Sequence, residues 1–300
     1  MSKEQIKQII KNQVTEDGMI ETGIKGVKLF YMSTSVRCAP VVYEPSIIAI
    51  VSGAKEAILD GNRYVYDSSQ YLCCSMSMPI EAGTPAASPN NPLMGVYISL
   101  DTKVMTELSI EIHSSTAGIV RQLQNTPQPL GLSLSHWDDA FIDALLRLLT
   151  LLENPVDTSI LGESRLRELY YALLKGESGI SAQRAFGVGN EIAQSIEYLS
   201  THLDDVITIE AMAKHVGMSR AVLHRKFKQA TSMSPIQFVK SMRLNTAAMK
   251  IATGTNVNTA AMQVGYVSSS QFSREFKRLY GCSPKQWTTN NRHLDSMSYP

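Results

Sequence analysis

The chain has 300 residues, the length of about two domains, and 28 basic against 27 acidic side chains leave a net charge of +1. Because 44% of its residues are hydrophobic and 18% are charged, it can bury a core, which excludes a wholly disordered chain, a collagen-like repeat and a coiled coil. No apolar run approaches the roughly 18 residues of a membrane span, and the first residues lack the apolar stretch of a signal peptide. Cys38, Cys73, Cys74 and Cys282 are scattered and form no C-x-x-C pair, so we expect a cytoplasmic protein with reduced thiols.

Short segments rich in β-branched and aromatic residues follow one another between residues 18 and 100. Asp60-Gly61 is typical of a tight hairpin, and the proline density of residues 84–92 predicts a loop. Many short strands at such spacing favour a jelly-roll barrel over a parallel sheet. The predicted strands are 27–31, 47–51, 56–59, 63–66, 71–75 and 94–100.

Between residues 135 and 175 the spacing of apolar residues becomes that of helices. The first predicted helix begins near Asp138 and ends at Asn154-Pro155. A second begins at about Ser164, and its apolar face either packs against the barrel or forms a homodimer interface.

The small net charge hides an asymmetry along the chain. Residues 1–189 carry 15 basic and 20 acidic side chains, whereas residues 190–293 carry 13 and 6. Residues 176–190, which contain glycine and serine, are predicted to connect two domains. The basic C-terminal part favours a polyanionic partner.

The C-terminal part contains an internal repeat. Residues 211–238 align with residues 260–287 at an offset of 48, which becomes 49 after one inserted residue. The two copies are therefore expected to form the same local structure. The matching positions include Leu223 with Phe272, Arg225 with Arg274, Phe227 with Phe276, Lys228 with Lys277, and Ser234-Pro235 with Ser283-Pro284.

Each copy is typical of a helix, a tight turn and a second helix. Gly217 and Gly265 are placed to end the first helix with a positive φ, and Ser219 and Ser268 can cap the second. Gln271, three residues after Ser268, predicts a capping box.

A long helix is predicted between the two copies. Ser234, Pro235 and Gln237 mark its start, and Gly254 ends it after about Thr253. At about 1.5 Å per residue it spans roughly 27 Å. That length suits a spacer that holds two recognition helices about one DNA turn, roughly 34 Å, apart.

Residues 190–290, above all VGYVSSSQFSREFKRLYGCSPKQW, resemble the signature region of the AraC/XylS family of bacterial transcription regulators. The resemblance implies a seven-helix domain whose two helix-turn-helix units read adjacent major grooves. The stretch SIIAIVSGAKEAILDGNRYVYDSSQYLCCS resembles the cupin-like N-terminal domain of some of these regulators. The expected fold is α+β and multidomain, with a cupin-like β-barrel sensor domain at 1–134, a helical dimerisation or linker segment at 135–189 and an all-α double helix-turn-helix domain at 190–293.

The second helix of each unit carries the residues expected to contact DNA. Arginine can bind guanine, glutamine can bind adenine, serine reaches bases or phosphate, and lysine neutralises phosphate. Alternatives stay open, since Arg225 and Arg274 can instead pair with a carboxylate such as Glu275, and His224 can simply be solvated. Ala221, where some family members carry a larger side chain, predicts lighter base readout. The expected DNA-binding residues are Arg220, His224, Arg225, Ser269, Ser270, Gln271, Arg274, Lys228 and Lys277.

In family members that sense small molecules, the barrel holds a pocket. Alternation places Tyr64 and Tyr66 on one side of their strand, and Tyr71 and Cys73 on one side of another, so these residues and Cys74 are candidates to line it. The alternative is that they pack a core or face solvent. Cys73-Cys74 also fits a sensor of reactive electrophiles if a thiolate is accessible, whereas buried cysteines are inert.

An enzyme built on the barrel is the alternative from another class of function. Metal-binding cupins need clustered histidines and a carboxylate, but none of the six histidines lies within residues 18–100. The sequence has no H-x-H or H-E-x-x-H motif, phosphate-binding glycine loop or G-x-S-x-G motif. We expect no catalytic residue, metal or cofactor.

The sequence is thus interpreted as a sequence-specific DNA-binding transcription regulator, an activator by resemblance, that responds to a small molecule or a reactive electrophile. Its expected partners are double-stranded promoter DNA, a second copy of the chain, RNA polymerase and a small-molecule effector, and no membrane. The alternatives are a cupin-type enzyme fused to a DNA-binding module and a ligand-independent repressor.

Overall fold

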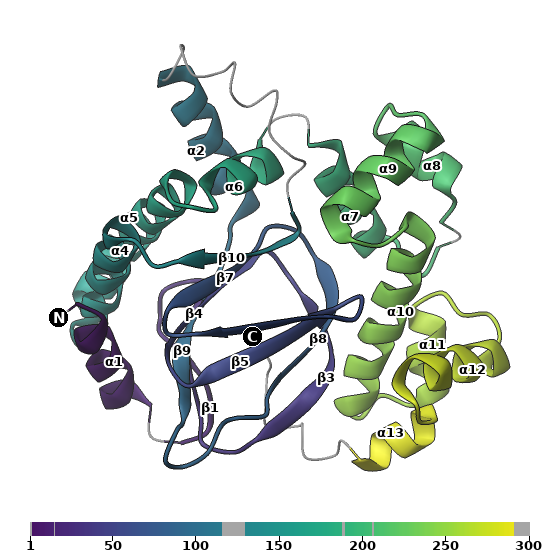
Figure 1. Cartoon of the computed structure of the whole chain (residues 1–300), viewed down its shortest axis with the longest axis horizontal. Coiled ribbons are helices and arrows are strands. Elements are labelled where there is room, and N and C mark those ends of the chain that lie inside the picture. The colour runs from purple at the N-terminus through teal and green to yellow at the C-terminus, as the bar shows by residue number, and fades with distance from the viewer. Residues whose placement is uncertain (1, 15, 116–129, 188–189, 206, 291–300) are drawn as a thin grey trace.

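The computed structural model describes residues 2–14, 16–115, 130–187, 190–205 and 207–290. Two antiparallel sheets and their flanking helices precede a C-terminal domain made of helices (Figure 1). This is the multidomain α+β arrangement that the sequence predicts. Residues 188–189 of the expected connector and residues 291–293 of the expected last domain lie outside the described part.

The two sheets, called here the sheet domain, have the strand orders β1-β2-β9-β4-β7-β10 and β3-β8-β5-β6. The strands are β1 (Gly18–Glu21), β2 (Val27–Met32), β3 (Val36–Tyr43), β4 (Ser46–Ser52), β5 (Ala54–Leu59), β6 (Asn62–Asp67), β7 (Gln70–Cys74), β8 (Met78–Thr84), β9 (Leu93–Ser99) and β10 (Leu132–His136). The domain boundary expected at residue 134 falls inside β10, because this strand pairs with β7 and completes the first sheet.

The predicted hairpin at Asp60-Gly61 is confirmed. Both residues have a positive φ, 48° and 78°, as a two-residue turn between antiparallel strands requires. The turn fixes the register of β5 on β6, in which Lys55 lies opposite Tyr66 and Ala57 lies opposite Tyr64.

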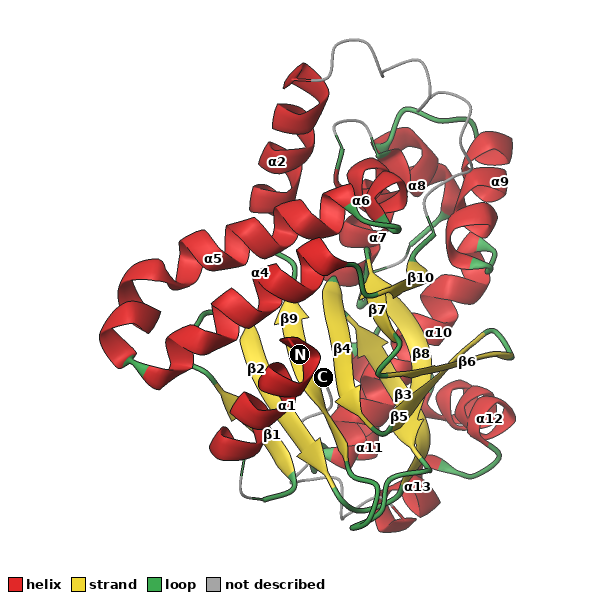
Figure 2. Cartoon of the chain, turned by 60° about the vertical axis from the view of Figure 1, so that its left-hand side comes forward, coloured by secondary structure: helices red, strands yellow, loops and turns green. Residues whose placement is uncertain are grey.

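Helices lie on the outer face of the first sheet and beside it. They are α1 (Ser2–Gln13), α2 (Thr102–Ser115), α4 (Asp139–Thr150), the short helix η1 (Leu151–Glu153), α5 (Pro155–Lys175) and α6 (Gly179–Phe186). Figure 2 shows α1 and α4 crossing this sheet. The second long helix begins at Pro155 and not at the expected Ser164, because the Asn154 side chain accepts the Val156 N–H and proline suits the first helical position. The expected connector contains α6.

The C-terminal domain has the seven helices that the resemblance implies, counted over residues 190–205 and 207–290. They are α7 (Glu191–Thr201), α8 (Ile209–His215), α9 (Arg220–Thr231), α10 (Pro235–Ala252), α11 (Val257–Gln263), α12 (Ser269–Tyr280) and α13 (Pro284–Asn290). Helix α10 begins with the predicted capping box of Ser234 and Gln237. It packs along β3 and β8, on the side of the second sheet away from the first (Figure 1).

Candidate functional site

The first helix-turn-helix unit consists of α8 and α9. Gly217 has a φ of 65° in the turn, and Ser219 caps α9 by accepting the Val222 N–H. Leu223 and Phe227 are completely buried, so the opposite face of α9 is left to solvent. The unit therefore presents α9 as an exposed helix held by an apolar core.

The second unit, α11 and α12, repeats this construction. Gly265 has a φ of 83°, and a Cβ there would lie 2.7 Å from the Leu203 carbonyl oxygen, so only glycine fits. Ser268 caps α12 through the Gln271 N–H, but the Gln271 amide points to Glu275 at 3.5 Å and does not close the predicted capping box. Phe272 and Phe276 are completely buried, as their counterparts are in the first unit.

All nine residues expected to contact DNA lie exposed on α9 and α12. Arg225 and Arg274 make no ion pair within the described part of the chain. Glu275, the alternative partner considered for Arg274, instead accepts hydrogen bonds from Lys240 at 3.0 Å and from the Tyr266 hydroxyl at 2.8 Å. The two equivalent arginines thus present their charge to an external anion.

Two other cations of the first unit are already paired. Arg220 forms an ion pair with Glu210 of α8, and Lys226 lies 3.7 Å from Glu191 of α7. Both pairs are at least partly exposed, where such pairs stabilise by at most about 1 kcal/mol. Arg220 can leave Glu210 for a base or a phosphate at little cost.

The five expected ligand-binding residues do not share one site. Tyr66 and Tyr64 lie on the face of β6 that carries Lys55 and Ala57 opposite them on β5, and Tyr66 is buried between the sheets. Cys74 also faces the space between the sheets, since its thiol lies 3.8 Å from the Tyr43 carbonyl of the opposite sheet.

Tyr71 and Cys73 occupy the other face of β7, which is a correction to the expected pocket lining. The Tyr71 ring stacks on Phe141 of α4 at 4.3 Å between ring centroids. Alternation placed Tyr71 and Cys73 together, but it does not say which face of a sheet points inward. These two side chains pack against the helical layer outside the sheets.

The adjacent thiols are fully buried. Burial raises the pKa of Cys73 to about 12 and raises the pKa of Cys74 well above its ordinary value. An electrophile reacts with an accessible thiolate, which neither residue offers in this fold.

Lys55 is the residue of this interior that the sequence analysis missed. Its side chain is only 1% exposed, and its Nζ lies 5.5 Å from the centroid of the Tyr43 ring and 5.9 Å from that of Phe30. Burial lowers the pKa of Lys55 to about 7, with a small opposing effect of Cys38. The hairpin register would have found it, because that register places Lys55 opposite Tyr66.

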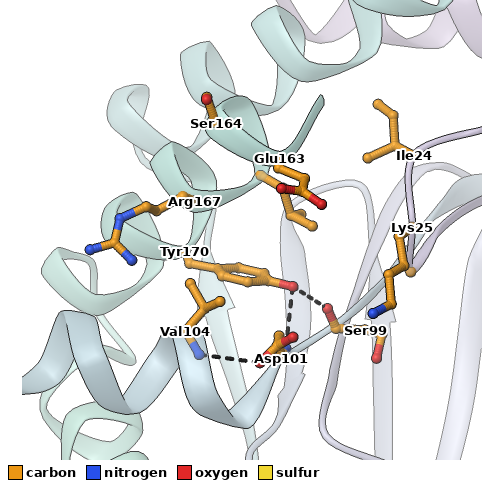
Figure 3. A pocket seen from close by; sticks show the side chains of 11 residues that line it. Ile24, Lys25, Ser99, Asp101, Val104, Glu163, Ser164, Arg167 and Tyr170 are labelled. Atoms are coloured by element: carbon orange, nitrogen blue, oxygen red, sulfur yellow. Dashed lines mark hydrogen bonds between the residues drawn. The ribbon is translucent and has the colours of Figure 1, made fainter. Parts of the chain in front are cut away.

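A pocket of about 430 Å³ lies outside the sheets, between the β1–β2 turn, the start of α2 and helix α5 (Figure 3). The Tyr170 hydroxyl in it donates to the Ser99 carbonyl oxygen at 2.5 Å and accepts the Asp101 N–H at 3.3 Å. None of the five expected ligand-binding residues lines this pocket.

Within the part of the chain that the structure describes, no group of three or more histidine, cysteine, aspartate or glutamate side chains is placed to hold a metal ion. The described helices include none that is long and apolar enough to cross a membrane.

Comparison with known proteins finds two family matches. Residues 23–181 match the family described as "AraC-type transcriptional regulator N-terminus", and residues 212–290 match a helix-turn-helix domain family. The chain is 27% identical to the raffinose operon regulatory protein RafR of Pediococcus pentosaceus, over 49% of this chain and 53% of that protein. It is 32% identical to the regulatory protein SoxS of Salmonella typhimurium, over 31% of this chain and 87% of that protein. The chain thus spans about half the length of the operon regulator.

Solved structures of ToxT from Vibrio cholerae share the fold. One, bound to a naphthyl-substituted butenoic acid, aligns with a TM-score of 0.58 at 15% identity over 88% of this chain and 99% of that chain. Another, bound to an unsaturated fatty acid, aligns with a TM-score of 0.55 at 13% identity over 92% of this chain and 97% of that chain. The likeness covers the sheet domain and the helical domain together.

Proposed function

Because the chain belongs to the family of AraC-type transcriptional regulators, we propose that it is a sequence-specific DNA-binding regulator of transcription whose sheet domain responds to a small molecule. Helices α9 and α12 enter successive major grooves of promoter DNA. The chain acts in the cytoplasm at the nucleoid and, as an activator, contacts RNA polymerase.

The observation that carries this proposal is the match between the two exposed helices. Arg225 and Lys228 of α9 recur as Arg274 and Lys277 of α12, and all four side chains are exposed. Folding needs the buried Leu223, Phe227, Phe272 and Phe276 on the other face, but it does not need the exposed cations to recur. Arginine and lysine are the side chains that bind guanine edges and phosphates in DNA.

Selection from a pool of random duplexes tests the proposal without knowledge of the operator. The full chain should enrich a duplex with two half-sites about one helical turn apart, and it should bind that duplex more tightly than a scrambled one at the same salt concentration. Equal affinity for the selected and the scrambled duplex would refute sequence-specific reading.

Lys55 supports one class of ligand for the sheet domain, an apolar molecule with a carboxylate. Among the described residues no carboxylate pairs with this ammonium group, which is buried near the Tyr43 and Phe30 rings. A ligand carboxylate would supply the compensating charge, and an apolar tail would contact the apolar side chains around it. Oleate is a suitable probe, and oleyl alcohol is its matched control without the charge. Wild type should bind oleate more tightly than Lys55→Met does, whereas the alcohol should not distinguish the two proteins. Equal binding of oleate by wild type and Lys55→Met would show that Lys55 does not contact the ligand.

Helix α5 supports a homodimer. Leu169 and Leu173, on the apolar face predicted for this helix, are buried inside the chain. The same helix leaves Val156 62% and Ile160 70% exposed near its start, which is unusual for large apolar side chains on one helix face. Sedimentation should show a dimer for wild type and a shift toward monomer for Ile160→Glu, and unchanged sedimentation would exclude this face.

A further inference from the structure

Asn245 of α10 is a buried amide at the contact between the two domains. Its side chain is 4% exposed. Its Nδ2 donates to the carbonyl oxygens of Val41 and Ile80, both at 2.9 Å, and these two residues are register partners on β3 and β8. Both of its N–H groups are therefore used to seat α10 on the second sheet.

The remaining polar atom of Asn245 holds the second recognition helix. Its Oδ1 accepts a hydrogen bond of 2.7 Å from the hydroxyl of Tyr280, the last residue of α12. The Tyr280 ring packs on Phe276 and Trp287, so it belongs to the core of the second unit. One side chain thus joins the sheet domain, α10 and α12.

The two helix-turn-helix units differ at this point. Thr231 stands in the first unit where Tyr280 stands in the second, and its hydroxyl donates to the carbonyl oxygens of Phe227 and Met233 within its own unit. At this position the first unit bonds within itself, whereas the second unit reaches the sheet domain through Tyr280 and Asn245. The first unit is tied to the sheet domain elsewhere, where the N–H of Gly131, just before β10, donates to the Ala230 carbonyl oxygen at 2.8 Å.

The apolar cores of the two units also differ in how they join the sheet domain. The core of the first unit, with Leu223 and Phe227, is continuous with the core of the sheet domain. The core of the second unit, with Phe272 and Phe276, is a separate cluster. Polar contacts such as those of Asn245 therefore count for more in holding the second unit in place.

We propose that Asn245 is a positioning residue for DNA recognition, which sets α12 against the β3–β8 edge so that the sheet domain controls the second recognition helix separately from the first. The inference rests on the proposed DNA binding. It assigns control to β3, the strand on which Tyr43 faces the Lys55 ammonium two residues after Val41.

Two full-length variants break the two halves of this contact separately. Tyr280→Phe removes the hydroxyl and keeps the ring, whereas Asn245→Asp replaces the two N–H donors by an acceptor and can still accept from Tyr280. Tyr280→Phe should weaken binding to the selected duplex by about three- to tenfold, the range expected for the loss of one hydrogen bond. Asn245→Asp loses two hydrogen bonds and sets an acceptor against two carbonyl oxygens, so it should weaken binding by at least as much. The loss should disappear on a duplex whose α12 half-site is scrambled, because α12 then contributes no specific contact.

Tyr170→Phe is the matched control, since it also removes one buried hydroxyl, here with two hydrogen bonds, but at the other side of the sheet domain. It should bind both duplexes as wild type does. The half-site of α12 is identified as the one whose scrambling abolishes the effect of Arg274→Ala.

The outcomes separate this inference from the proposed function. If wild type binds the selected and the scrambled duplex equally, the proposed DNA reading and the positioning role of Asn245 are both refuted. If wild type prefers the selected duplex but the two variants bind as wild type does, or lose equally on the intact and the scrambled duplex, only the positioning role of Asn245 is overturned. A merely structural effect would lower binding to both half-sites alike.

Discussion

Arg225 and Arg274 occupy the same position on two separate helices, each following its capping serine by the same interval and each exposed. Neither makes an ion pair within the described residues. Two unpaired guanidinium groups on equivalent surfaces are what a protein needs to read two half-sites of DNA with one repeated element.

Replacing either arginine should weaken specific DNA binding. We expect Arg225→Ala and Arg274→Ala each to cost about 1–3 kcal/mol on the selected duplex and to relax sequence preference in one half-site only. Arg37→Ala, an exposed arginine on β3, is the matched control and should leave the affinity unchanged. Loss of preference in both half-sites from a single variant would contradict separate reading by α9 and α12.

The equivalent lysines should act through phosphate. Lys228→Ala and Lys277→Ala should each weaken binding to specific and random DNA by similar factors and reduce the slope of log affinity against log salt by about one. Titrations at several salt concentrations measure this slope. An unchanged slope would show that these side chains do not neutralise phosphate.

Lys55 should make stability depend on pH. Burial lowers its pKa to about 7 in the folded state, whereas the value in an unfolded chain is about 10.4. Below pH 7 both states hold the proton, and the burial penalty is fully present. Between these two values only the unfolded state binds the proton, so the free energy of unfolding rises with pH, by up to about 1.4 kcal/mol per pH unit.

Urea unfolding of wild type and Lys55→Met at pH 6.5, 7.5 and 8.5 checks this. The variant should be the more stable protein at pH 6.5, and its advantage should shrink as the pH rises. Lys25→Met, at an exposed lysine, serves as the control. A stability difference between wild type and Lys55→Met that stays constant with pH would show that Lys55 is not held in a low-dielectric interior.

Cys73 and Cys74 should resist alkylation in the native state. Burial removes access and raises the pKa of both thiols, so iodoacetamide at pH 8 should modify the half-buried Cys38 and Cys282 first. Peptide mass spectrometry before and after unfolding measures the order. Rapid labelling of Cys73 or Cys74 in the native protein would instead support the hypothesis that these cysteines sense reactive electrophiles.

The sequence predicted the helical domain more completely than the sheet domain. Serine caps, Ser-Pro helix starts and glycines with positive φ are local signals, and the repeat doubles each of them. Strand β3 was missed because Pro40 argues against a strand, yet β3 is an edge strand, where a proline is tolerated.

The interior of the sheet domain could be predicted only in part, because contacts between distant elements decide which face of a strand points inward. Alternation groups Tyr71 with Cys73, but only the packing of α4 decides that this face points away from the other sheet. The contact of Asn245 with Val41 and Ile80 joins residues far apart in sequence, and no local sequence pattern predicts it.

The most direct test of two-site reading changes the distance between the half-sites. Helix α10 is a continuous spacer between the two units, so the proposed reading requires α9 and α12 to bind the same face of the duplex. Insertion of about 5 base pairs, half a helical turn, moves one half-site to the opposite face. The affinity of the full chain should then fall to that of a duplex with a single half-site, and an unchanged affinity would contradict reading by two rigidly connected helices.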